Sequence, residues 1–187
     1  MRLLTNISAP AGKSLRYSKR ELERRFLLGS KPRGEVVKVV QIIDRYFLGT
    51  RLRLRQMRSA RGDVTSTIFK LTQKVPAPDG APGLISTMYL SQEEYALLAA
   101  LPAAELRKTR YSMPPFGVDV FDSPLDGLIM AEVEFDDIDA LETFSPPSWV
   151  ITEVTRDGRF TGGHLATLGV ADLKALLSQF NLHSAAG

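Results

Sequence analysis

The chain has 187 residues, of which 44% are hydrophobic and 24% are charged. This composition is typical of one globular domain with its own hydrophobic core, and it excludes an intrinsically disordered chain. The 24 lysines and arginines nearly balance the 21 aspartates and glutamates, which leaves a net charge of +3. Such a balance does not by itself indicate nucleic-acid binding, so the positions of the charges matter more than their sum.

The chain contains no cysteine and only two histidines. Disulfides and thiolate metal sites are therefore excluded, and a zinc site is not expected. Any bound metal should be a hard divalent cation held by carboxylates, such as Mg²⁺, Mn²⁺ or Ca²⁺. Residues 1–15 lack the apolar core of a signal peptide, and no apolar run is long enough to span a membrane. We expect a cytoplasmic monomer or homodimer that binds neither nucleic acid nor membrane.

Most of the chain after a loose arm, which ends near residue 16, shows strand patterns. Period-two alternation or β-prone composition predicts strands around residues 21–26, 36–48, 51–55, 64–74, 84–90, 108–111, 118–120, 131–135 and 150–155. Ser91 and Glu94 form the pattern of a capping box, which predicts a helix start. A short helix is expected within residues 161–168 and a C-terminal helix over about 171–180. We therefore predict a single α+β domain over residues 1–187, with an antiparallel sheet or barrel.

Charged side chains recur on one face of several predicted strands. The acids of this pattern are Glu21, Glu23, Glu132 and Glu134, and its bases are Arg51, Arg53, Arg55, Lys108 and Arg110. On one strand such alternation usually means a solvated outer face. Like charges two residues apart repel unless a counter-charge or a ligand lies between them. If these faces point inward, Glu23, Arg53, Lys108 and Glu134 should converge on one space suited to a phosphate with bound cations. Alternation alone does not decide between the two faces.

Seven short motifs resemble, in order, those of the CYTH or triphosphate-tunnel family. The run Glu21-Leu-Glu-Arg-Arg25 resembles the ExExK signature, and Lys108-Thr-Arg110-Tyr111 resembles the K-x-R-Y segment. The other five motifs are the tyrosine strand at 44–48, the arginine strand at 51–55, the lysine strand at 68–70, the paired-acid region at 118–134 and the segment at 149–157. The resemblance covers about residues 19–169, which leaves a C-terminal helix over about 170–182.

The resemblance implies a closed, eight-stranded antiparallel β-barrel, or tunnel, with a few helices packed outside. It implies an enzyme, namely a metal-dependent phosphohydrolase of inorganic tripolyphosphate or a nucleoside triphosphate, with Mg²⁺ or Mn²⁺ as cofactor. The implied metal ligands are Glu21, Glu23, Glu132, Glu134 and Glu153. The implied substrate-binding residues are Arg25, Arg53, Arg55, Lys70, Lys108, Arg110 and Asp119. The implied catalytic residues are Glu153 near the attacking water, Arg25, and Tyr46 in proton transfer.

Two departures from the family pattern leave alternatives open. Arg25 stands where the signature has lysine, which keeps the charge but changes its shape. Residues 84–90 contain no acid, although this strand usually carries acids in the family, so one metal-binding wall is thinner. Asp119 either contacts the ligand or pairs with an arginine. The alternative functions are a class IV-type adenylate cyclase and a protein that binds polyphosphate or nucleotide without turning it over.

Overall fold

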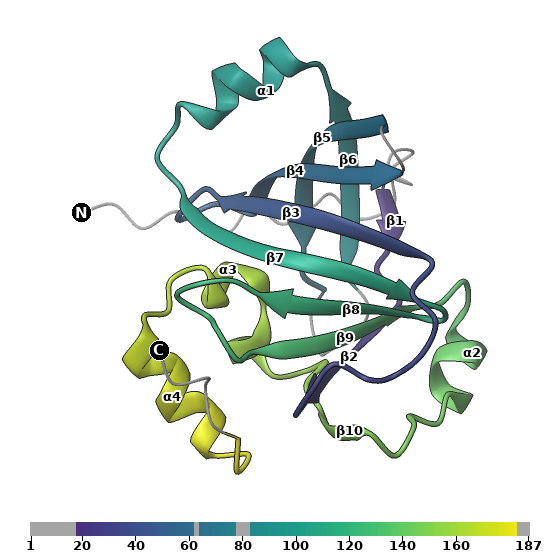
Figure 1. The fold of residues 1–187 in the computed structure, drawn as a ribbon. Coiled ribbons are helices and arrows are strands. Elements are labelled where there is room, and N and C mark those ends of the chain that lie inside the picture. Colours follow the sequence, from purple (N-terminus) through teal and green to yellow (C-terminus); the bar gives the residue numbers. More distant parts are fainter. Residues whose placement is uncertain (1–17, 62–63, 78–82, 183–187) are drawn as a thin grey trace.

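One antiparallel sheet of ten strands forms most of the protein (Figure 1). The structure, a computed structural model, describes residues 18–61, 64–77 and 83–182. The strands are β1 (Ser18–Arg20), β2 (Glu23–Leu28), β3 (Lys38–Tyr46), β4 (Leu52–Arg61), β5 (Val64–Val75), β6 (Leu84–Leu90), β7 (Ala104–Met113), β8 (Phe116–Phe121), β9 (Ile129–Glu134) and β10 (Val150–Glu153). Alternating polar and apolar residues predicted most of them, and the bounds of β6 are those expected from the sequence.

The prediction of a closed, eight-stranded barrel is wrong. The sheet order is β1-β6-β5-β4-β3-β7-β8-β9-β2-β10, so within the described part of the chain β1 and β10 are free edges and no ladder joins them. Only Glu21 and Leu22 separate β1 at one edge from β2 beside the other edge. The chain thus connects the two ends of the sheet without pairing them. Edge pairing depends on long-range backbone hydrogen bonds, which side-chain alternation does not encode.

The strand register places the predicted charged residues on a common face. Directly paired residues of neighbouring strands share a face of the sheet. One such row runs from β7 to β6 through Leu106, Asp44, Arg55, Lys70 and Tyr89. A second row passes in the other direction, from β7 to β2, through Arg110, Asp119, Met130 and Leu27. The basic and acidic strands therefore contribute to one surface.

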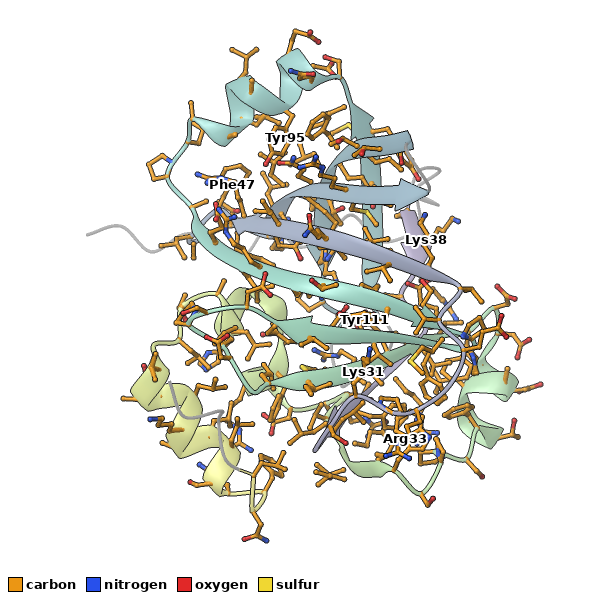
Figure 2. All side chains as sticks on the ribbon, in the orientation of Figure 1. Lys31, Arg33, Lys38, Phe47, Tyr95 and Tyr111 are labelled. Carbon is orange, nitrogen blue, oxygen red and sulfur yellow. The ribbon has the colours of Figure 1, made fainter. Side chains whose placement is uncertain are left out.

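Helix α1 (Gln92–Ala99) covers the opposite face of the sheet near β5. Its start confirms the predicted capping box, because Ser91 Oγ accepts from the Glu94 N–H while the Glu94 carboxylate accepts from the Ser91 N–H. Tyr95 points from α1 toward the sheet (Figure 2), and its ring lies 4.4 Å from that of Phe69. Among the described residues, no helix is long and apolar enough to cross a membrane.

The C-terminal helices were expected outside the strands, but they pack against the charged face at one end. These are η2 (Gly158–Phe160), α3 (Gly162–Leu165) and α4 (Val170–Ser178). Their buried side chains share one hydrophobic core with inner-face residues of β2, β7, β8 and β9. The core comprises Leu27, Leu106, Phe121, Leu125, Leu128, Met130, Val154, Phe160, Leu165, Leu173, Leu176 and Leu177. This apolar cluster closes one end of the charged face.

A second core lies on the other face of β2 and β9. It contains Phe26, Leu28, Met113, Val118, Ala131 and Val133. The loop after helix α2 (Ile138–Thr143) covers this core through Phe144 and Trp149. The sheet is thus apolar on both faces around Leu27 and Leu28 at one end of β2, while its charged residues gather in the middle of the inner face.

Candidate active site

The charged face encloses a cavity of about 110 Å³. Every strand from β2 to β9 contributes to its walls, so the sheet curls around this space. The lining residues are Glu21, Glu23, Arg25, Tyr46, Arg53, Arg55, Lys74, Ile85, Leu106, Lys108, Arg110, Phe121, Met130, Glu132, Glu134, Phe160, Gly162 and Leu165. The expected convergence of Glu23, Arg53, Lys108 and Glu134 is therefore found.

The cavity adjoins a wider groove of about 1270 Å³. Glu21, Arg25 and Arg53 line both spaces, so the cavity and the groove lie side by side. Arg51 and Arg156 line only the groove. Basic side chains on the groove would attract an anionic ligand toward the cavity.

A buried carboxylate fixes the cations of β4. Asp44, fully buried on β3, accepts two hydrogen bonds of 2.6 Å from Nε and Nη2 of Arg55. The same carboxylate lies 3.6 Å from Nε of Arg53. Burial alone would raise the pKa of Asp44, but the two guanidinium groups lower it below its ordinary value. Asp44 therefore holds both arginines toward the cavity, as an anion.

A second buried carboxylate orients the cations of β7. Asp119 on β8 is 1% exposed and accepts from Lys108 Nζ at 2.5 Å and from Nε and Nη2 of Arg110 at 2.6 Å. Arg110 also donates to the carboxylate of Glu132 on β9. Charge-assisted pairs of this kind restrict a guanidinium to one orientation. In this structure Asp119 acts as the counter-ion of two predicted phosphate-binding residues.

The ion pairs leave the cavity without spare charge. Six lysines and arginines and four glutamates line it, and Asp44 and Asp119 lie directly beneath. When all are ionised, six positive groups face six negative ones. A multiply charged anion therefore cannot enter alone without creating a large negative excess in a partly buried space.

The acids cluster at the β2–β9 ladder. Glu23 lies directly opposite Glu134, and Arg25 lies opposite Glu132. Burial raises the pKa of Glu23 to about 7, and the nearby carboxylate of Glu132 adds to the rise. Burial alone would also raise the pKa of Glu132, but Arg110 and Lys108 hold it far below its ordinary value. Crowded carboxylates with a raised pKa are typical of a site that a cation completes.

No three carboxylate or histidine residues of the described chain are grouped so that they could hold a metal ion as they stand. Glu21 is already paired with Lys74, and Glu132 with Arg110. A divalent cation would therefore have to replace these lysine and arginine partners. The donors themselves are suitable, because carboxylate oxygens are the ligands that Mg²⁺ and Mn²⁺ prefer.

Three of the predicted site residues do not line the cavity, and one of them, Asp119, lies beneath it as a counter-ion. Lys70 lies beyond Arg55 on the same row, with its Nζ 5.0 Å from the ring centre of Tyr89. Glu153 pairs in register with Phe26, on the other face of β2, and accepts from Arg24 at 2.6 Å. Glu153 is therefore not part of the cavity wall that the other four acids line, but it borders the adjoining groove together with Glu21 and Glu23.

Sequence reasoning missed two residues of the site. Lys74 lines the cavity and pairs with Glu21. Its spacing of four from Lys70 along one strand puts both on the same face, which the alternation already contained. Asp44 stands two residues before Tyr46 in a motif that we singled out for its tyrosine. An isolated acid in an apolar strand gave no indication that it is the buried counter-ion of two arginines.

Tyr46 forms the side of the cavity next to α3. A Cβ added to Gly162 would overlap the Tyr46 hydroxyl and lie 2.7 Å from Cζ of the ring, so only glycine permits this approach. Burial raises the pKa of Tyr46 to about 12, and the carboxylate of Asp44 adds to the effect. The phenol therefore remains protonated at neutral pH and can donate a hydrogen bond.

Comparison with known proteins identifies relatives of this chain. It is 36% identical over 160 residues to an inorganic triphosphatase of Nitrosomonas europaea, an alignment that covers 78% of this chain and 96% of the relative. It is also similar to the crystal structure of the inorganic triphosphatase NE1496, with a TM-score of 0.52, 28% identity and coverage of 79% of this chain and 95% of the other. A second crystal structure of NE1496 gives a TM-score of 0.53 at 29% identity and covers 80% of this chain and 99% of the other. No protein-family model matches the chain.

Proposed function

The chain belongs to the family of the Nitrosomonas europaea inorganic triphosphatase, and from this premise we propose that it hydrolyses inorganic tripolyphosphate with divalent cations held in the charged cavity. Hydrolysis of a triphosphate is the activity that its relatives carry in their names. The tripolyphosphate substrate, the Mg²⁺ or Mn²⁺ dependence and the assignment to the CYTH family are our proposals. The order of the motifs and the convergence of residues from five of them on one cavity support these proposals.

The neutrality of the cavity is the observation that carries this function. With all groups ionised its six cations match six carboxylates, and protonation of Glu23 would leave only one positive charge in excess, so a triphosphate would still bring several uncompensated negative charges with it. Divalent cations that enter with the substrate restore the balance. The same cations relieve the repulsion between Glu23 and Glu134, which lie directly opposite each other. Substrate and metal should therefore bind cooperatively.

Four acids would hold the metal in this proposal: Glu21, Glu23, Glu132 and Glu134. All four line the cavity and present hard oxygen donors. When bound, Mg²⁺ or Mn²⁺ supplies charge neutralisation at the phosphoryl oxygens and polarises the phosphorus for attack. Coordination of Glu21 and Glu132 would remove the partner of Lys74 and one partner of Arg110, which would keep its bonds to Asp119, so that both cations could turn to phosphate oxygens.

Basic side chains would bind and orient the triphosphate. The cavity is lined by Arg53, Arg55, Lys108 and Arg110. Hydrogen bonds to Asp44 or Asp119 hold the last three of these in fixed orientations. Planar guanidinium groups match phosphate oxygens in pairs, and a preorganised cation loses little entropy when the anion arrives. These residues would also stabilise the charge that develops on the transferred phosphoryl group. The protonated Tyr46 can donate to a phosphate or leaving oxygen.

Release of orthophosphate from tripolyphosphate, with Mg²⁺, with Mn²⁺ and with excess chelator, tests the proposal. We expect release only with a divalent cation. Arg53→Lys should raise the KM about tenfold, because the bidentate contact is lost while the charge remains. Arg107→Lys, on the exposed side of β7, is the matched control and should leave the KM unchanged. Formation of cyclic AMP from ATP would instead identify a cyclase, and tight binding without any product would identify a non-catalytic binding protein.

A further inference from the structure

We propose that Arg25 is a positioning residue that locks the C-terminal wall of the cavity against the sheet. This residue stands at the lysine position of the opening motif, where a phosphate contact was expected. Its side chain is 13% exposed and points into the cavity, but its terminal nitrogens are bound to backbone of the C-terminal segment. The inference relies on the proposed function only for its consequence on turnover.

Four hydrogen bonds of 2.9 Å or shorter join Arg25 to this segment. Its Nη1 donates to the carbonyl of Phe160 at 2.8 Å, and its Nη2 donates to the carbonyl of Thr155 at 2.6 Å. The backbone N–H of Arg25 donates to Thr155 Oγ1 at 2.9 Å, and its carbonyl accepts from the N–H of Val154 at 2.8 Å. Bonds from a charged guanidinium to carbonyls are stronger than neutral ones. One residue of β2 therefore fixes both ends of a short loop.

The fixed loop leads directly into the wall of the cavity. Phe160, Gly162 and Leu165 follow it in the chain, and all three line the cavity. The close approach of Gly162 to Tyr46 requires this segment to be held accurately. Displacement of the loop would move the wall away from Tyr46 and enlarge the space in which the substrate has to be aligned.

Arginine suits this task and lysine does not. The planar guanidinium reaches two carbonyls at once, whereas an ammonium group is a point charge on a flexible stem. Only Nε of Arg25 is left: it is buried, has no hydrogen-bond partner within the described residues, and lies 3.5 Å from Glu23 Oε1. The charge of Arg25 thus still acts on the acids of the cavity, while its two terminal nitrogens bind the backbone of the C-terminal wall.

Amide hydrogen exchange combined with kinetics tests the inference on the purified full chain. In Arg25→Lys we expect exchange over residues 156–168 to become about tenfold faster, with no change in β3 or β7. The kcat for tripolyphosphate should fall while the KM stays within about threefold of its original value. Arg55→Lys is the matched control, because Arg55 lines the same cavity but binds Asp44 instead of the wall. It should raise the KM and leave exchange over residues 156–168 unchanged.

Arg25→Gln is the second variant, since it removes the charge and can still donate to one carbonyl. Unchanged exchange over residues 156–168 in both Arg25 variants would overturn the inference, as would faster exchange with an unchanged kcat. A raised KM with unchanged exchange would make Arg25 a phosphate ligand only. If the unaltered protein releases no phosphate, the proposed function fails, and the exchange comparison alone decides whether Arg25 locks the wall.

Discussion

Asp44 and Arg55 form a parallel pair of hydrogen bonds across the β3–β4 ladder, with both N–O distances at 2.6 Å and the carboxylate fully buried. They are also direct register partners, so the backbone and the side chains place them together. The pair is fixed before any ligand binds. It sets the direction in which the guanidinium faces the cavity.

Replacing Asp44 by Asn should therefore destabilise the protein by about 3–5 kcal/mol, because Arg55 would be left buried without its counter-ion. Urea unfolding monitored by circular dichroism measures this loss. Glu105→Gln is the control, since Glu105 makes two arginine pairs with a side chain that is 30% exposed, and it should cost no more than about 1 kcal/mol. A loss for Asp44→Asn as small as that of the control would contradict a structural role for the buried pair.

The buried pair also predicts that the protein loses stability at acid pH. Burial by itself would raise the pKa of Asp44, but Arg55 and Arg53 bring it below its ordinary value. The carboxylate thus contributes stability above the pKa of an unfolded aspartate, and this contribution is lost as the pH falls through the lower pKa of the folded state. Asp44→Asn should flatten the decline of the unfolding midpoint below about pH 4. An equally steep decline in the variant would mean that other groups cause the loss of stability at acid pH.

Glu23 predicts the opposite pH dependence in the absence of metal. Its pKa is raised to about 7 in the folded protein, against about 4.3 for an unfolded glutamate. Between these values the folded state keeps a proton that the unfolded state has released, so this group makes stability fall as the pH rises from about 4.5 to about 7. Unfolding midpoints measured with chelator over this range should show the fall. Saturating Mg²⁺, which favours the carboxylate, should remove it.

Glu23→Gln is the control for that titration. In this variant the unfolding midpoint should no longer fall as the pH rises, and Mg²⁺ should no longer raise it, because the carboxylate that links the two effects is gone. A Mg²⁺ effect of undiminished size in this variant would place the cation away from Glu23.

Gly162 is predicted to tolerate no side chain. In Gly162→Ala the new Cβ would overlap the ring and hydroxyl of Tyr46, so we expect a loss of about 1–3 kcal/mol in the free energy of unfolding. Gly158→Ala is the control from the same segment, because a Cβ there meets nothing within 4 Å, and it should stay within about 0.5 kcal/mol. Adding Tyr46→Phe should recover part of the loss, since it removes the overlapping hydroxyl. Equal stability of the two alanine variants would show that the wall can move aside at no cost.

Glu134 and Glu153 form a matched pair for testing the metal site. Both come from family-like motifs, but only Glu134 faces Glu23, whereas Glu153 binds Arg24 on the other face of β2. Glu134→Gln should weaken Mg²⁺ binding in calorimetry by at least roughly tenfold, with little change in the unfolding midpoint. Glu153→Gln should leave Mg²⁺ affinity unchanged and cost up to about 1 kcal/mol of stability. Loss of Mg²⁺ affinity in Glu153→Gln would mean that β10 rearranges when the cation binds.

Local patterns in the sequence determined the elements that line the cavity. Alternation of charged and apolar residues predicted the strands that carry Glu23, Arg53 and Glu134, because a pleated strand separates neighbours onto two faces. The Ser91–Glu94 pattern located the start of α1, because its hydrogen bonds lie within one turn of chain. Helix α2 escaped prediction, since it has only six residues and none of them is buried, so it leaves no apolar periodicity beside its Asp137 cap.

Only the tertiary structure decided which way each face points and where the sheet ends. Alternation predicts only which residues of the same strand share a face with Glu153 or with Arg24. The register between β10 and β2 determines that these two side chains meet, and that they do so on the outer face of the sheet. The ten-strand order with free edges arises from backbone hydrogen bonds between distant segments. Side-chain periodicity does not specify which strands form these bonds. The guanidinium of Arg25 likewise donates to backbone carbonyls about 130 residues further along the chain, a contact that no local pattern encodes.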